Sequence, residues 1–190
     1  MSDDIWVESL SNRVRAMNTL YGWAAEDLTV EQVNHHERTG VLPLGFSFLH
    51  FMKIQDTSIS RQFLGEEGVW DAEGWAQRVG VNIDKQGREE TVEEMEQLRV
   101  QDWDAYREYQ AKVIERTTRA LASTDRATLE TVVIPRLPGN MRNIYCALVV
   151  GDGPVRKLEV VECFVYQHGL RHMGEIEHGR ALVGLGGMTS

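Results

Sequence analysis

Cysteine is scarce in this sequence, and other features that define particular classes of protein are missing as well. Only two of the 190 residues are cysteines, Cys146 and Cys163, and they form no CxxC motif. Such usage is typical of a reducing compartment rather than of a secreted domain held by disulfides. No apolar run reaches the length of a membrane span, and the acidic first residues lack the basic and apolar regions of a signal peptide. We therefore expect a cytoplasmic protein with no membrane partner.

Basic residues are outnumbered, with 20 lysines and arginines against 29 aspartates and glutamates, for a formal net charge of -9. An acidic surface without a basic stripe repels phosphate backbones, so we expect no nucleic-acid partner. Two common catalytic patterns are also missing. The glycine-rich segments 151–154 and 184–187 lack the flanking strand and helix of a phosphate-binding loop, and no nucleophile elbow of a hydrolase occurs.

The residues that are present predict one all-α domain over 1–190. Hydrophobic residues make up 42% of the chain, which is enough for a sizeable core. Apolar residues recur at helical spacing, and capping boxes begin at Thr29 and Thr91. The pattern predicts four long helices, over about 5–25, 44–63, 91–122 and from Pro154 to about 184. They imply a four-helix bundle with long connections at 65–90 and 123–155. The β-prone runs 131–134 and 144–150 leave room for a small β-hairpin within 123–155.

His168 and His172 are the most informative pair of residues. Four positions apart on a helix, their imidazoles lie on one face and can bind the same ion. Val161, Val165 and Ile176 follow the same stripe, which indicates that the pair points into the protein. A buried imidazole needs a partner, and a metal ion supplies one. The alternative is that the two histidines bond each other or nearby carbonyl groups.

His50 falls on the apolar face of the second predicted helix and supplies a third inward imidazole. Three neutral imidazoles can fix a divalent metal and leave its other positions open to water or substrate. Imidazole suits zinc, nickel, copper and iron alike. Glu175 lies seven residues beyond His168, where it could accept a proton, orient a ligand or complete the coordination; alternatively, it is a partly solvated helix residue. His35 and His36 are interpreted as loop residues, His178 as a surface residue and Cys163 as a core residue.

Two segments resemble the DinB/YfiT-like superfamily of metal-binding four-helix bundles. They are Phe48-Leu-His50 and His168-Gly-Leu-Arg-His172-Met-Gly-Glu-Ile176. The resemblance implies a histidine triad of His50, His168 and His172 that holds a divalent metal, commonly nickel or zinc, and it implies a homodimer. Characterised members include enzymes that use mycothiol, bacillithiol or glutathione as S-transferases or as maleylpyruvate isomerase. The connections 65–90 and 123–155 are longer than in that pattern, which leaves the substrate open.

Three hypotheses remain for the function. The first two expect a small-molecule substrate, and the third expects a metal ion or a partner. The first is a metal-dependent transferase with a small thiol cosubstrate, whose carboxylates Arg171 could bind. The second is metal-assisted hydrolysis, in which hydroxide replaces the thiol as nucleophile. The third is a metal-binding or partner-binding bundle without catalysis. Glu175 is the one candidate for proton transfer in the enzymatic cases.

Overall fold

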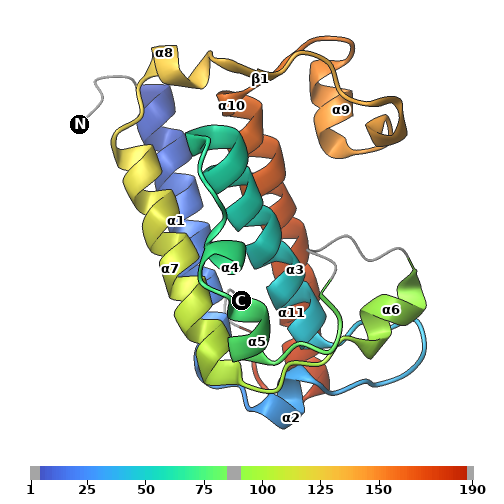
Figure 1. Cartoon of the computed structure of the whole chain (residues 1–190). Coiled ribbons are helices and arrows are strands. Elements are labelled where there is room, and N and C mark those ends of the chain that lie inside the picture. Colours follow the sequence, from blue (N-terminus) through green and yellow to red (C-terminus); the bar gives the residue numbers. More distant parts are fainter. Residues whose placement is uncertain (1–4, 85–90, 188–190) are drawn as a thin grey trace.

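The computed structural model describes residues 5–84 and 91–187, and four long helical rods run side by side in it (Figure 1). The first is α1 (Ile5–Glu26), and the third is α7 (Trp103–Ala122). The second is α3 (Leu44–Thr57), which continues as the π-helical segment η1 (Ser58–Leu64). The fourth joins α10 (Lys157–Glu159), the π-helical η3 (Val160–Gln167) and α11 (His168–Leu182). The predicted all-α fold of four long helices is confirmed.

The rods bury one continuous core because each carries an apolar stripe at three- and four-residue spacing. α1 packs against α7, and α3 lies between α7 and α11. Aromatic rings fill much of the centre: Tyr106 stacks on Trp103 and meets the edge of Phe48. The largest fully buried side chains include Trp75, Tyr21, Tyr106, Tyr109, Phe48 and Phe51.

Short helices join and flank the rods: α2 (Val30–Val33), α4 (Val69–Ala72), α5 (Trp75–Val79), α6 (Val92–Gln97) and α8 (Arg126–Leu129). In Figure 1, α2 lies at one end of the bundle and α8 at the opposite end, while α4 and α5 pack against α7. The capping box expected at α2 is present. Thr29 Oγ1 accepts from the Gln32 backbone N–H at 3.3 Å, and Gln32 Oε1 accepts from the Thr29 N–H at 3.0 Å.

The single helix predicted over 91–122 was wrong, because α6 and α7 are separate. The chain is extended at Leu98, and α7 begins after Asp102, whose carboxylate accepts from the Ala105 N–H at 2.8 Å. The backbone between them bonds to distant asparagines. Asn82 Oδ1 accepts from the N–H of residue 99 at 2.6 Å, and Asn34 Oδ1 accepts from that of residue 100 at 2.9 Å. These tertiary bonds replace the intrahelical ones that continuous periodicity had implied.

The small β-hairpin is confirmed: β1 (Val132–Ile134) pairs antiparallel with β2 (Val155–Arg156). Between the strands lie the 3-10 turn η2 (Gly139–Met141) and the helix α9 (Tyr145–Val150). Residues 144–150 had been interpreted as β-prone, yet most of them form α9. Strand propensity depends on a neighbouring strand, and the two residues of β2 are already paired with β1.

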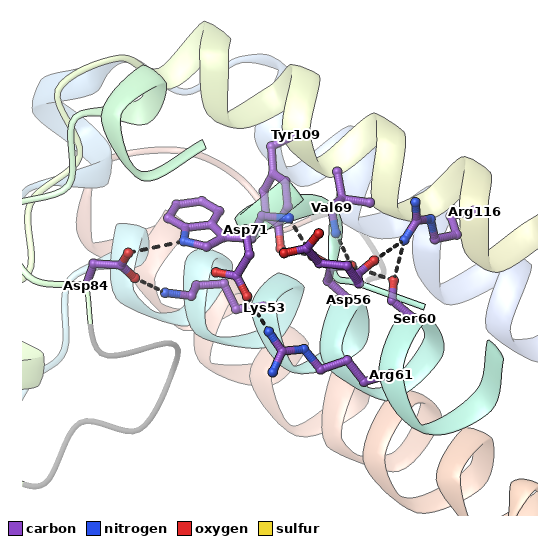
Figure 2. Close-up of polar contacts among 11 residues, drawn as sticks. Lys53, Asp56, Ser60, Arg61, Val69, Asp71, Asp84, Tyr109 and Arg116 are labelled. Atoms are coloured by element: carbon purple, nitrogen blue, oxygen red, sulfur yellow. Dashed lines mark hydrogen bonds and ion pairs between the residues drawn. The ribbon is translucent and has the colours of Figure 1, made fainter. Parts of the chain in front are cut away.

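A buried carboxylate attaches the connection that begins at residue 65 to the bundle (Figure 2). Asp56, on α3, is 2% exposed and accepts the backbone N–H groups of Val69 and Trp70, at 2.9 and 2.8 Å. It also accepts from Ser60 Oγ at 2.8 Å and from Tyr109 Oη at 3.3 Å. The carboxylate thereby satisfies the first N–H groups of α4, which are otherwise without helical partners.

Over the described ranges, no helix is both long enough and apolar enough to cross a bilayer.

Candidate metal centre

Helices α3 and α11 bring the three predicted histidines together. His50 lies on α3, while His168 and His172 begin α11 one turn apart. One ring nitrogen of each lies within 4.8 Å of the corresponding nitrogens of the other two. His172 is buried, and His50 and His168 are half-buried, so the cluster lies at the edge of the core rather than at its centre. The predicted convergence of the three imidazoles is confirmed.

A glycine allows the two helices to approach. A Cβ at Gly169 would lie 2.6 Å from Phe51 Cζ and would also clash with Met17 Sδ. The Gly169 carbonyl accepts from Tyr21 Oη at 2.9 Å, which joins α11 to α1 as well. Gly169, the residue next to His168, is therefore held by close packing against Phe51 and Met17 and by the hydrogen bond from Tyr21. These contacts fix the position of the imidazole pair.

The rings form a compact triangle. Ring centroids are separated by 4.6 Å between His168 and His172, 4.8 Å between His50 and His172, and 5.4 Å between His50 and His168. Phe46, one turn before His50, stacks on its ring at 5.2 Å and limits its rotation. The Nε2 atoms of His168 and His172 are 2.8 Å apart, so the two rings also form the mutual hydrogen bond that was the alternative interpretation of the pair. Two nitrogens on a tetrahedral zinc lie roughly 3.3 Å apart at ordinary bond lengths, so a small outward shift would admit an ion.

Glu175 orients one of the imidazoles. His172 Nδ1 donates to Glu175 Oε2 at 2.7 Å, and Ser47 Oγ donates to the same oxygen at 3.0 Å. A carboxylate bonded to one ring nitrogen leaves the other with its lone pair free for a metal, an arrangement common around ligating histidines. Of the three roles predicted for Glu175, this contact matches the orientation of a ligand. Sequence reasoning missed Ser47, although its place three residues before His50 on the same helix was a usable signal.

The surroundings shift the pKa values of His168 and Glu175. Burial, together with the neighbouring His172, His50 and Arg171, lowers the pKa of His168 to about 3. Burial acts to raise the pKa of Glu175, but hydrogen bonds from His172 and Ser47 outweigh it and leave that pKa below its usual value. A metal ligand such as His168 must be neutral, and a carboxylate that orients a neighbouring histidine, as Glu175 orients His172, must be ionised. The donor set therefore fits a divalent ion.

The other candidate residues lie elsewhere. His35 pairs with Glu37 at 3.0 Å, His36 lies 3.7 Å from Glu96, and His178 is exposed. His35 and His36 lie in a loop, as predicted, although His36 is half-buried, and the surface position of His178 is confirmed. Cys146 and Cys163 are both buried and free, and they pack against each other in a small separate core with Val155 and Val160.

Comparison with known proteins supports the fold and leaves the activity open. No family model matches the sequence, and no curated protein sequence matches it. The chain is similar in structure to a conserved protein from Enterococcus faecalis, with a TM-score of 0.73 and 15% sequence identity. The match covers 93% of this chain and 95% of the other. At that identity the likeness shows a shared fold.

Proposed function

We propose that this chain is a DinB/YfiT-like protein that holds a divalent metal ion, nickel or zinc, through His50, His168 and His172. The observation that carries the proposal is the convergence of three ring nitrogens from two helices within 4.8 Å. Glu175 and Ser47 add the hydrogen bonds that orient a ligating histidine. Three protein ligands are one fewer than a closed structural zinc site uses, which favours an open centre.

We further propose that the centre serves a transferase that uses a small thiol. A divalent ion bound only by neutral imidazoles keeps most of its charge, and so favours the thiolate form of a sulfur ligand. His172 and Glu175 hold the geometry, and Arg171 supplies positive charge beside them for an acidic cosubstrate. Both hydrogen bonds of Glu175 Oε2 go to His172 and Ser47, which favours an orienting role over that of a general base in hydrolysis.

Metal content tests the first part of the proposal. Protein stripped with a chelator and dialysed against nickel or zinc is expected to retain about one ion per chain, and His172→Ala is expected to retain none. His178→Ala is the matched control, since this exposed histidine lies on the same helix. Elemental analysis, with circular dichroism to confirm folding, gives the result. A wild-type chain that stays metal-free would overturn the proposal.

Turnover of an electrophilic model compound tests the second part. The metal-loaded protein is expected to consume a chloronitroaromatic compound only with bacillithiol, mycothiol or glutathione present, and His172→Ala is expected to be inactive. Full hydrolysis of an ester substrate without any thiol would replace the transferase with a hydrolase. A metal-loaded protein inactive in every assay would leave a non-catalytic metal-binding bundle.

A further inference from the structure

A groove of about 390 Å³ lies on the surface along η3 and the first turn of α11. Its size is within the range of small-molecule sites. Three parts of the chain build it: Arg13 comes from α1, Tyr145 from α9, and the remaining residues from η3 and α11. The side chains that give the groove its character are Arg13, Tyr145, Tyr166, Gln167, Leu170 and Arg171.

The groove adjoins the histidine cluster. Gln167 directly precedes His168 in the chain, and Arg171 follows it by three residues, so the Arg171 side chain is a helix-face neighbour of the His168 ring. The charge of Arg171 acts on both His168 and Glu175, which places the guanidinium near both groups. A molecule lying in the groove is therefore within reach of the centre along the edge of α11.

The lining combines positive charge with aromatic surface, in a chain whose net charge is -9. Arg13 lies over the Tyr166 ring, 5.0 Å from its centroid, and only 3.8 Å separates it from Glu162, the single carboxylate of the lining. Within the described residues, Arg171 forms neither an ion pair nor a hydrogen bond. Two guanidinium groups against one carboxylate leave the groove with a surplus positive charge.

The other residues that line the groove indicate which kind of ligand its positive charge would bind. Tyr145 is 46% exposed and Leu170 is 43% exposed, so both present apolar surface to a ligand. A guanidinium binds a carboxylate through two parallel hydrogen bonds, and an aromatic ring provides a face for an apolar body.

We propose that this groove binds an organic carboxylate with an aromatic or apolar body, held at its charged end by Arg171 and Arg13. The body lies against Tyr145, Tyr166 and Leu170, and the charged end, held by Arg171, lies nearest the metal centre. The proposal names the substrate class of the same site and rests on the proposed function only in this last step. Anion binding itself follows from the groove alone.

Benzoate and its uncharged analogue benzamide are suitable probes of the charged end. In saturation-transfer NMR titrations of the full chain, metal-free and zinc-loaded, benzoate is expected to bind more tightly than benzamide. Arg171→Gln is expected to weaken benzoate about tenfold or more, as the loss of a charge-assisted hydrogen bond does, and to leave benzamide unchanged. Arg13→Gln is expected to act in the same direction.

Arg15→Gln is the matched control, because Arg15 lies on α1 outside the groove and bonds Asn12 at 2.8 Å. It is expected to bind benzoate as the wild type does. Equal affinity for benzoate and benzamide, or unchanged benzoate binding in both Arg171→Gln and Arg13→Gln, would overturn the anion site. These titrations need no metal, so they are independent of the metal proposal.

The link to the metal centre has its own measurement. Protein loaded with paramagnetic cobalt(II) is expected to speed the relaxation of bound benzoate ring protons relative to zinc-loaded protein. His172→Ala treated with cobalt is expected to lose this effect while still binding benzoate. Equal relaxation in the cobalt and zinc forms of the wild type would mean that benzoate does not bind near the metal centre. The groove would then be rejected as the substrate site.

Discussion

The Asp56 side chain connects α3 to the start of α4 through hydrogen bonds. Replacing it with alanine leaves the N–H groups of Val69 and Trp70 without their acceptor inside the protein. We expect Asp56→Ala to lower the free energy of unfolding by about 3 kcal/mol or more, because several buried donors lose their partner at once. Urea denaturation measures the change.

Thr57→Ala is the control for Asp56→Ala, since Thr57 is the neighbouring residue on α3 and is only half-buried. Its substitution is expected to change stability by much less. Equal effects of the two substitutions would mean that the Asp56 hydrogen bonds contribute little.

Glu159 couples stability to pH. Burial acts to raise its pKa, but hydrogen bonds from the Arg156 side chain and backbone, together with the Arg156 charge, outweigh burial and lower the pKa below 4.5. A carboxyl group with a depressed pKa stabilises the fold fully above its unfolded value, and loses this contribution as the pH falls through its folded value. We expect Glu159→Gln to cost about 1–2 kcal/mol at pH 7 and much less at pH 3.

Chemical denaturation at the two pH values checks this expectation. Glu115→Gln serves as the comparison, because the Glu115 side chain is 69% exposed and lies 3.9 Å from Arg119. A cost for Glu159→Gln that is the same at both pH values would exclude the ionised pair as its cause.

At the scale of one helix, α11 offers two glycines with opposite surroundings. A methyl group at Gly169 would collide with Phe51 and Met17, whereas none of the heavy atoms around Gly174 comes within 4 Å of such a group. We expect Gly169→Ala to destabilise the protein by about 1–3 kcal/mol through overpacking. Gly174→Ala is expected to stabilise it by up to about 1 kcal/mol through helix propensity.

Thermal unfolding of the two metal-free variants gives both values. Opposite signs are the expected result, and a stabilising Gly169→Ala would show that α3 and α11 separate at little cost. Because Gly169 adjoins His168, its alanine variant is also expected to bind metal more weakly than Gly174→Ala.

The elements that could be predicted from sequence are those with long periodic stripes. The four long helices needed only the spacing of apolar residues. The break between α6 and α7 could not be predicted, because it depends on Asn34 and Asn82, which lie far away in the chain. Helix α9 was missed for a related reason: its β-branched residues favour a strand only where a partner strand is free.

The histidine triad was predictable because helical spacing fixes which side chains share a face. The pairing of His168 and His172 followed from their spacing on a single helix. The position of His50 beside them followed from the assumption that the apolar faces of the helices pack against each other. Ser47 and the groove could not be found in this way. Tyr145 reaches the groove from α9, and Arg13 from α1, so their proximity depends on packing between distant elements.

At the scale of the whole molecule, the described residues form two hydrophobic cores of very different size. The large one joins the four rods, while the small one consists of Cys146, Val155, Val160 and Cys163 with a few partly buried neighbours. α9 stands away from the rods in Figure 1, and Leu148 on it is 78% exposed. Regions with little buried apolar surface open at low free energy, so α9 is expected to open before the bundle.

Hydrogen exchange followed by mass spectrometry tests this order of opening. Residues 144–150 are expected to exchange well before α3 and α7. Val155→Ala, in the small core, is expected to speed exchange in 144–150 and leave α3 unchanged, because it removes buried contacts only there. Simultaneous exchange of both regions would mean that the chain opens as one unit.

The π-helical η3 has a consequence for how this chain tolerates insertions and deletions. Its wider turns accommodate more residues per turn than α-helical ones do. A π-helical turn holds one residue more than an α-helical turn, so deleting one residue from η3 would convert a wide turn into an α-helical one and leave the residues on either side on their present faces. The same deletion in an α-helical part of the rod would rotate its two halves against each other by about 100°. A shortened fourth rod is therefore expected to keep its metal ligands in place only where the lost residue comes from η3.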